Sequence, residues 1–108
     1  MEKFIKGNIV VVSFPFSDLS SSKRRPALVL SDFIENDVIL CQITSKPYSE
    51  YSICIADEDF AEGNLPMTSY VKPNRIFTAH KDIILEKVGT LNTNMYEKII
   101  QSIYNLIK

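Results

Sequence analysis

Residues 6–14 read KGNIVVVSF and residues 23–31 read KRRPALVLS, and these two stretches decide the fold. Each contains four consecutive apolar residues bounded by polar or turn-forming residues, which is the pattern of a short β-strand. A residue that precedes proline is biased toward extended backbone, so we expect Arg25 at the threshold of the second strand. The stretches predict strands over residues 9–14 and 27–31, with Lys23, Arg24 and Arg25 ending the Ser-rich loop between them.

Further short apolar segments predict strands over residues 38–44, 52–56, 69–71, 75–78 and 84–88. Helical periodicity begins at Met95, where apolar residues recur three or four positions apart as far as residue 107. Asn94 with Glu97 fits a capping box, although Thr93 or Asn92 fits the N-cap equally well. We therefore expect a mainly β fold, a small SH3-like barrel of bent antiparallel strands with a C-terminal α-helix.

Length and composition indicate one globular domain spanning residues 1–108. The chain has 108 residues, 45% of them hydrophobic and 23% charged, as in soluble globular proteins. It contains neither an apolar run long enough to cross a bilayer nor an apolar export signal, so we expect a cytoplasmic protein without membrane contact. Cys41, Cys54 and the single histidine are too few for a zinc site, so both cysteines are interpreted as core thiols.

The charge distribution is more informative than the net charge of −1. Basic residues occur in the Arg-Pro segment and at predicted loop edges further along the chain, namely at Lys23, Arg24, Arg25, Lys46, Lys72 and Arg75. If the fold brings these edges together, they form a local positive patch on a nearly neutral protein. A guanidinium binds phosphate through two parallel hydrogen bonds, so Arg25 is a candidate phosphate ligand; the alternative is a solvated arginine.

Thr44 ends the predicted strand over residues 38–44, where its hydroxyl could donate to a phosphoryl oxygen held by Arg25. The alternative is that threonine is present for its β-propensity. Ser45 points to the opposite face and Lys46 adds charge.

The lone His80 excludes the two-histidine acid–base pair of many metal-free ribonucleases unless a second chain contributes its copy. The acidic run over residues 57–59 is more typical of a solvated surface than of a metal site, so we expect neither metal nor cofactor.

Four segments together resemble the PemK/MazF (Kid-like) toxins of bacterial type II toxin–antitoxin pairs. They are residues 7–12 (GNIVVV), residues 25–31 (RPALVLS), residues 43–45 (ITS) and the helix that follows Gly89-Thr90-Leu91. The resemblance covers nearly the whole chain, and the Arg-Pro strand preceded by a Gly-led strand is its most specific part. It implies a dimeric SH3-like barrel that cleaves single-stranded RNA at short sequences without metal and is silenced by a cognate antitoxin.

By position, the catalytic arginine of that family falls on Arg25 and its strand-end hydroxyl residue falls on Thr44. We expect further RNA contacts from the surrounding basic and hydroxyl side chains, namely Lys23, Arg24, Ser45, Lys46, Lys72 and Arg75. Many members carry Gly-Ser-Glu-Gln-like residues before the Arg-Pro, where this chain has Leu19-Ser20-Ser21-Ser22-Lys23. Some members also use an acidic residue where this chain has Lys72-Pro73-Asn74-Arg75, so no carboxylate role is transferred.

The resemblance implies attack of a ribose 2′-hydroxyl on the adjacent phosphorus, giving a 2′,3′-cyclic phosphate and a 5′-hydroxyl. The competing interpretation is a non-catalytic toxin or binding module on the same fold. Such a protein would act on a protein target such as a topoisomerase, as the structurally related CcdB toxins do. Loss of the acidic position favours this alternative, whereas the presence of Arg25 together with Thr44 favours the nuclease.

Overall fold

The computed structural model describes residues 4–15, 22–46 and 50–108, with side chains described over 4–13, 24–46 and 50–108. Three helical segments accompany the strands: two 3-10 turns, Asp57–Asp59 (η1) and Lys81–Ile83 (η2), and the α-helix α1, Thr93–Ile107. The strands are β1 (Asn8–Pro15), β2 (Ser22–Val29), β3 (Asp37–Thr44), β4 (Ile53–Ile55), β5 (Phe60–Gly63), β6 (Ser69–His80) and β7 (Ile84–Leu91).

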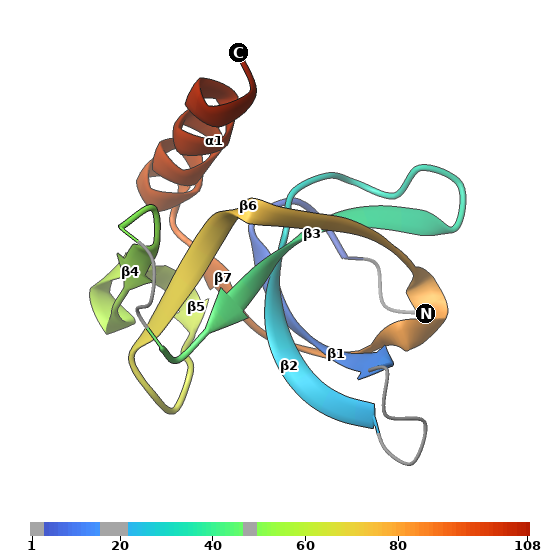
Figure 1. Cartoon of the computed structure of the whole chain (residues 1–108). Coiled ribbons are helices and arrows are strands. Elements are labelled where there is room, and N and C mark those ends of the chain that lie inside the picture. The colour runs from blue at the N-terminus through green and yellow to red at the C-terminus, as the bar shows by residue number, and fades with distance from the viewer. Residues whose placement is uncertain (1–3, 16–21, 47–49) are drawn as a thin grey trace.

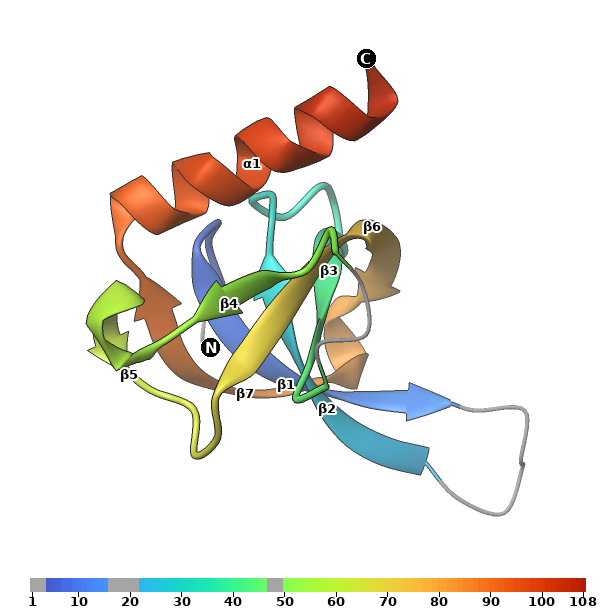
Figure 2. The same cartoon turned by 60° about the vertical axis from the view of Figure 1, so that its left-hand side comes forward.

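The seven strands form one antiparallel sheet in the order β4-β6-β3-β2-β1-β7-β5. Figures 1 and 2 show that β1, β2 and β6 bend strongly, so that the sheet curls on itself. Helix α1 lies across one end of the curled sheet, and its C-terminal turns extend beyond it (Figure 2). This architecture confirms the predicted class, a mainly β fold of bent antiparallel strands with a C-terminal helix.

The central strands are buried on both faces of the sheet. Ile9 of β1 and Leu28 of β2 belong to a core that also contains Ile99 of α1. Their chain neighbours Val10 and Ala27 belong to a second core on the opposite face. Because both faces are covered, these strands read as unbroken apolar runs rather than as alternating apolar and polar residues.

The prediction that the basic cluster ends a loop is wrong, because β2 begins at Ser22 rather than at Ala27. The reason is that β1 extends to Pro15 and supplies pairing partners for this part of the chain. Arg25 pairs with Val12 and Arg24 pairs with Ser13, so both arginines lie inside a strand. Strand pairing thereby fixes the backbone of both arginines, so a ligand would be contacted through their side chains.

The two strands predicted over residues 69–71 and 75–78 are one continuous strand, β6, with Pro73 in its interior. A bulge accommodates the proline: Cys41 pairs with Ile76 and Ile43 pairs with Val71, so Gln42 alone faces the four intervening residues of β6.

Burial raises the pKa of the Cys41 thiol to about 12, so the thiol stays protonated at neutral pH. It donates to the Lys72 carbonyl at 3.0 Å, which satisfies a backbone acceptor in the bulge.

Three further expectations differ from the structure. Cys54 is exposed rather than a core thiol, because it lies on the short edge strand β4 between partly buried Ile53 and buried Ile55. The strand predicted over residues 84–88 continues through Gly89 to Leu91, since that glycine pairs with Ile9 of β1. Strand β5 was not predicted; it forms because Phe60 and Gly63 pair with β7.

The periodicity predicts a buried stripe of Met95, Ile99, Ile100, Ile103, Leu106 and Ile107. Helix α1 buries Met95, Ile99 and Ile103, whereas Leu106 and Ile107 at its C-terminal end are exposed, because that end extends beyond the sheet. Of the possible N-caps, the structure selects Asn92, whose side chain accepts the Met95 N–H at 2.8 Å. Its amide group also donates to the Glu58 carbonyl at 3.3 Å, which ties the start of the helix to η1. No helix in the described part of the chain is long and apolar enough to cross a membrane.

The cap assignment predicts different stabilities for two neighbouring asparagine variants. Asn92→Ala should lower the free energy of unfolding by about 1 kcal/mol, because it leaves an N–H of the first turn without its side-chain acceptor. Asn94→Ala should change it by less than about 0.5 kcal/mol, because Asn94 is exposed inside the helix. Urea unfolding followed by circular dichroism measures both values, and a larger loss for Asn94→Ala would contradict the assignment.

Candidate active site

A cavity opens where two neighbouring strands separate. Strand β3 pairs with β2 only as far as Ala27, opposite Gln42, whereas β1 remains paired with β2 out to Ser22. Pro26, directly before Ala27, has no backbone N–H to offer to a neighbouring strand. Beyond this point β2 and β3 diverge, and a cavity of about 280 Å³ lies between them.

The cavity brings together four of the side chains that the sequence selects. Its main walls combine basic, hydroxyl and apolar side chains from three segments: Arg24, Arg25 and Pro26 of β2, Ile43, Thr44 and Ser45 at the end of β3, and residues 65–67 between β5 and β6. Continuing the register of the β2–β3 ladder places Arg25 opposite Thr44, and Arg24 opposite Ser45. Because the strands separate, side chains from both faces of the sheet reach this space.

Arg25 is half-buried, and its Nε atom is out of contact with solvent, whereas Arg24 is exposed. The two side chains point to opposite faces of β2, that of Arg25 to the face of Ala27 and that of Arg24 to the face of Leu28. A guanidinium stays charged in such a setting, and water screens its charge less than that of an exposed group. Of the two arginines, Arg25 is therefore the better placed to act on a bound anion.

Thr44 is half-buried at the end of β3, opposite Tyr70 of β6. Its Oγ1 accepts the backbone N–H of Lys46 at 3.2 Å. A hydroxyl that accepts in this way keeps its own proton available for donation. The Lys46 amide thus orients the Thr44 oxygen, and the O–H group can donate to a ligand in the cavity.

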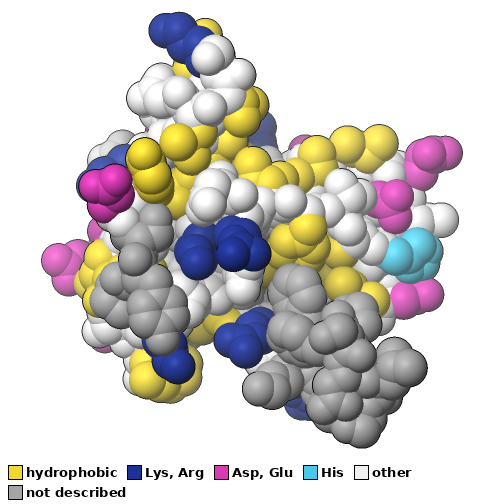
Figure 3. All heavy atoms as spheres, viewed as in Figure 1, with side chains coloured by type: hydrophobic (Ala, Val, Ile, Leu, Met, Phe, Trp, Pro, Cys, Tyr) yellow, Lys and Arg dark blue, Asp and Glu magenta, His cyan; other side chains and the backbone are white. Residues whose placement is uncertain are grey.

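The remaining predicted site residues either lie outside the lining of the cavity or have side chains that the structure does not describe. Lys46 is exposed next to Ser45, whereas Lys72 and Arg75 lie on the bulged part of β6 and do not line the cavity. The backbone of Lys23 belongs to β2, but its side chain and the Ser-rich residues 16–21 are outside the described part. Figure 3 shows Lys and Arg side chains near the middle of one face, with acidic side chains at its edges.

Sequence reasoning missed the apolar wall formed by Leu65, Pro66 and Met67. The sequence patterns predict no strand or helix for this segment, although three apolar residues in a row within a polar stretch are a signal for a buried or binding surface. Ser69, which is buried, donates its hydroxyl proton to the Met67 carbonyl at 2.9 Å and so holds the segment against β6. The segment leads directly into β6, where Tyr70 pairs with Thr44.

The described lining of the cavity contains no histidine or carboxylate. His80 ends β6 opposite Asp37, where its Nδ1 accepts the Asp82 N–H at 3.1 Å, and does not line the cavity. Within residues 4–15, 22–46 and 50–108, no group of three His, Cys, Asp or Glu residues could hold a metal ion. The chemistry that this site offers is a fixed positive charge and a hydroxyl donor, which suits the binding of a phosphate group.

Solved structures share the fold at low sequence identity. An endoribonuclease from Mycobacterial species has a TM-score of 0.73 and 20% identity, with 97% of this chain and 91% of that chain covered. Another, in complex with its cognate antitoxin, has a TM-score of 0.75 and 18% identity, covering 94% and 92% of the two chains. A MazE–MazF crystal structure from Deinococcus radiodurans has a TM-score of 0.79 and 16% identity, covering 98% and 97%.

A comparison with curated proteins found no match. The family comparison is more decisive, because it extends over residues 5–107 and so includes every described strand and the helix. It confirms the resemblance carried by the Arg-Pro strand and the Ile43-Thr44-Ser45 segment. The chain belongs to the family described as PemK-like, MazF-like toxins of type II toxin–antitoxin systems.

Proposed function

We propose that this toxin is a sequence-selective endoribonuclease that cleaves single-stranded RNA in the cytoplasm without a metal ion. The observation that carries the proposal is the cavity that Arg25 and Thr44 line together, from strands that diverge on either side of it. Two features add support: the family to which the chain belongs, and the naming of two similarly folded proteins as endoribonucleases. A cognate antitoxin is the expected inhibitor, since one of those structures contains one.

The expected reaction begins with attack of a ribose 2′-hydroxyl on the adjacent phosphorus. The O2′–P bond forms as the 2′-hydroxyl loses its proton, and the P–O5′ bond breaks as the 5′-oxygen takes up a proton. The products carry a 2′,3′-cyclic phosphate and a 5′-hydroxyl, with no net change in protons. The transient phosphorane has more negative charge than the phosphodiester, so the Arg25 guanidinium binds it more strongly than the ground state. Thr44 donates a hydrogen bond to a phosphoryl oxygen, and Arg24, Ser45 and Lys46 hold the strand through neighbouring groups.

Arg25 and Thr44 should therefore matter to different extents. Arg25→Ala removes the charge that faces the phosphorane and should slow RNA cleavage by about 100-fold or more. Thr44→Val keeps the shape of the side chain and deletes only the donor, so the rate should fall by about 10-fold. Arg24→Ala is the matched control, because it removes an exposed neighbouring charge. It should weaken RNA binding mildly, and the loss should depend on salt concentration.

Single-turnover cleavage of an RNA substrate by each variant measures these effects, with circular dichroism to establish that each variant is folded. Parent-like cleavage by Arg25→Ala together with loss of cleavage in Arg24→Ala would move the catalytic assignment to Arg24. If neither arginine matters, the nuclease proposal fails and a toxin that binds a protein target takes its place.

Cleavage should not depend on a divalent cation. The described residues around the cavity supply a guanidinium and a hydroxyl rather than a group of metal ligands. EDTA should therefore leave the rate of RNA cleavage unchanged, and added magnesium should not increase it apart from a general salt effect. Loss of cleavage in EDTA that magnesium restores would contradict the mechanism.

The protein should be a two-fold symmetric dimer, in which the RNA-binding surface extends across both chains. The family resemblance motivates this prediction, and the exposed apolar residues Tyr104, Leu106 and Ile107 at the end of α1 are consistent with a protein interface. Light scattering at micromolar concentration should give about twice the chain mass of 12.3 kDa. A stable monomer at that concentration would contradict it.

A further inference from the structure

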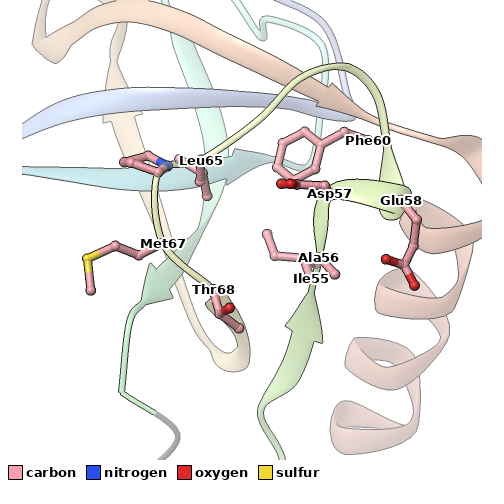
Figure 4. Close-up of a pocket in the computed structure, with 9 residues that line it drawn as sticks. Ile55, Ala56, Asp57, Glu58, Phe60, Leu65, Met67 and Thr68 are labelled. Atoms are coloured by element: carbon pink, nitrogen blue, oxygen red, sulfur yellow. The ribbon is translucent and has the colours of Figure 1, made fainter.

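A second cavity, of about 310 Å³, lies next to the candidate active site. The two cavities share one wall, the apolar segment Leu65-Pro66-Met67. The rest of the second cavity is built by the end of β4, by η1 and by Phe60 at the start of β5. Figure 4 shows Leu65 beside this space, whereas the Met67 side chain points away from Phe60 and Asp57. Only the segment of residues 65–67 therefore separates a ligand in one cavity from a ligand in the other cavity.

The Phe60 ring is a fixed aromatic surface in this cavity. It packs against the bare backbone of Gly89, where a Cβ atom would lie 2.9 Å from each of two ring carbons. A side chain at position 89 would therefore displace the ring. Pairing of Phe60 with Leu91 on β7 fixes its backbone as well. Planar aromatic side chains held in this way provide stacking surfaces for unpaired nucleobases.

Asp57 provides a carboxylate that is not committed to the fold. The Asp57 residue is exposed, and its carboxylate forms no hydrogen bond or ion pair within the described part of the chain, although its backbone carbonyl accepts the Phe60 N–H. Figure 4 shows its carboxylate beneath the Phe60 ring, pointing toward Leu65. Asp59, in contrast, already accepts the Ala56 N–H at 2.8 Å. Glu58 also lines the cavity, but Figure 4 shows its carboxylate directed away from Phe60. The cavity thus combines an aromatic surface with the Asp57 carboxylate next to it.

These groups select one kind of ligand. A carboxylate repels a phosphate, so the backbone of an RNA strand is disfavoured here, whereas donor groups on a base edge are favoured. Guanine presents two adjacent donors, N1–H and the N2 amino group, which match the two oxygens of a carboxylate. Adenine and cytosine present one amino donor beside an acceptor nitrogen, and uracil presents a single N–H between two carbonyl oxygens.

We infer that this second cavity is a guanine-selecting pocket for the RNA strand whose phosphate occupies the neighbouring active site. The inference rests on the proposed function and adds a determinant of its sequence preference. The base stacks on Phe60 and donates from its Watson–Crick edge to Asp57, while the strand passes over residues 65–67. Met67, a residue that is 63% exposed, offers an apolar contact along that path.

The test is cleavage of an RNA pool randomised in sequence, with the new 5′ ends identified by sequencing. The parent protein should show guanine enriched at one fixed distance from the cut. Asp57→Asn replaces one acceptor oxygen with a donor, so the preference for guanine over adenine at that position should fall by about 10-fold or more. Glu86→Gln is the matched control: it also removes one exposed negative charge, but it lies on β7 outside both cavities and should keep the preference.

A second measurement does not depend on cleavage: nuclear magnetic resonance shifts of the parent protein on addition of guanosine or adenosine. Guanosine should perturb residues 57–60 more than adenosine does, and Asp57→Asn should remove the difference. Cleavage without a guanine preference at a fixed position would overturn the pocket and leave the nuclease intact. Guanosine binding at residues 57–60 without RNA cleavage would support the pocket and contradict the nuclease proposal. If the protein neither cleaves RNA nor binds guanosine at these residues, both proposals are contradicted.

Two further outcomes of the same experiments would also overturn the inference. An equal loss of preference in Glu86→Gln would show an effect of overall charge rather than of the Asp57 contact. If Asp57→Asn keeps the RNA preference and instead weakens binding of the cognate antitoxin, the cavity is a docking site for a protein segment.

Discussion

Burial of β1, β2 and β3 on both faces is the constraint on which the rest of this structure depends. Each of these strands contributes alternate residues to two cores, one of them closed by α1. Polar groups at the ends of the apolar runs then hold the strands in position. The Asn8 side chain, for example, accepts the Ile5 N–H at 2.9 Å and donates to Thr90 at 3.1 Å. Such a sheet is rigid at its centre, and functional groups can be placed only where the pairing stops.

The candidate active site is located at one such place. The β2–β3 ladder ends at Ala27, next to a proline that cannot extend it, while β1 keeps the outer half of β2 ordered. Arg25 is therefore held on a paired backbone with its side chain beside an open gap. Rigid placement of this kind is what transition-state stabilisation requires, because the charge does not have to be reorganised during the reaction.

The two cavities differ in electrostatic character although they share a wall. The cavity between β2 and β3 carries guanidinium and hydroxyl groups, whereas the cavity beside η1 carries carboxylates and an aromatic ring. A polyanion with exposed bases, such as single-stranded RNA, can satisfy both at once, with phosphate in the first and a base in the second. The net charge of −1 conceals this separation, since opposite charges in different loops cancel in the sum.

Local sequence patterns determined the class of the fold: the apolar runs predicted most strands, and the periodicity from Met95 predicted α1. The family resemblance indicated Arg25 and Thr44 as site residues, and both line one cavity. Tertiary structure alone decided how far β2 extends, that β6 continues through Pro73, and that residues 65–67 form a wall. It also decided that Cys54 is exposed. These features depend on partners distant in the sequence, because strand pairing and burial are set by which segments meet in space and not by the residues of one segment.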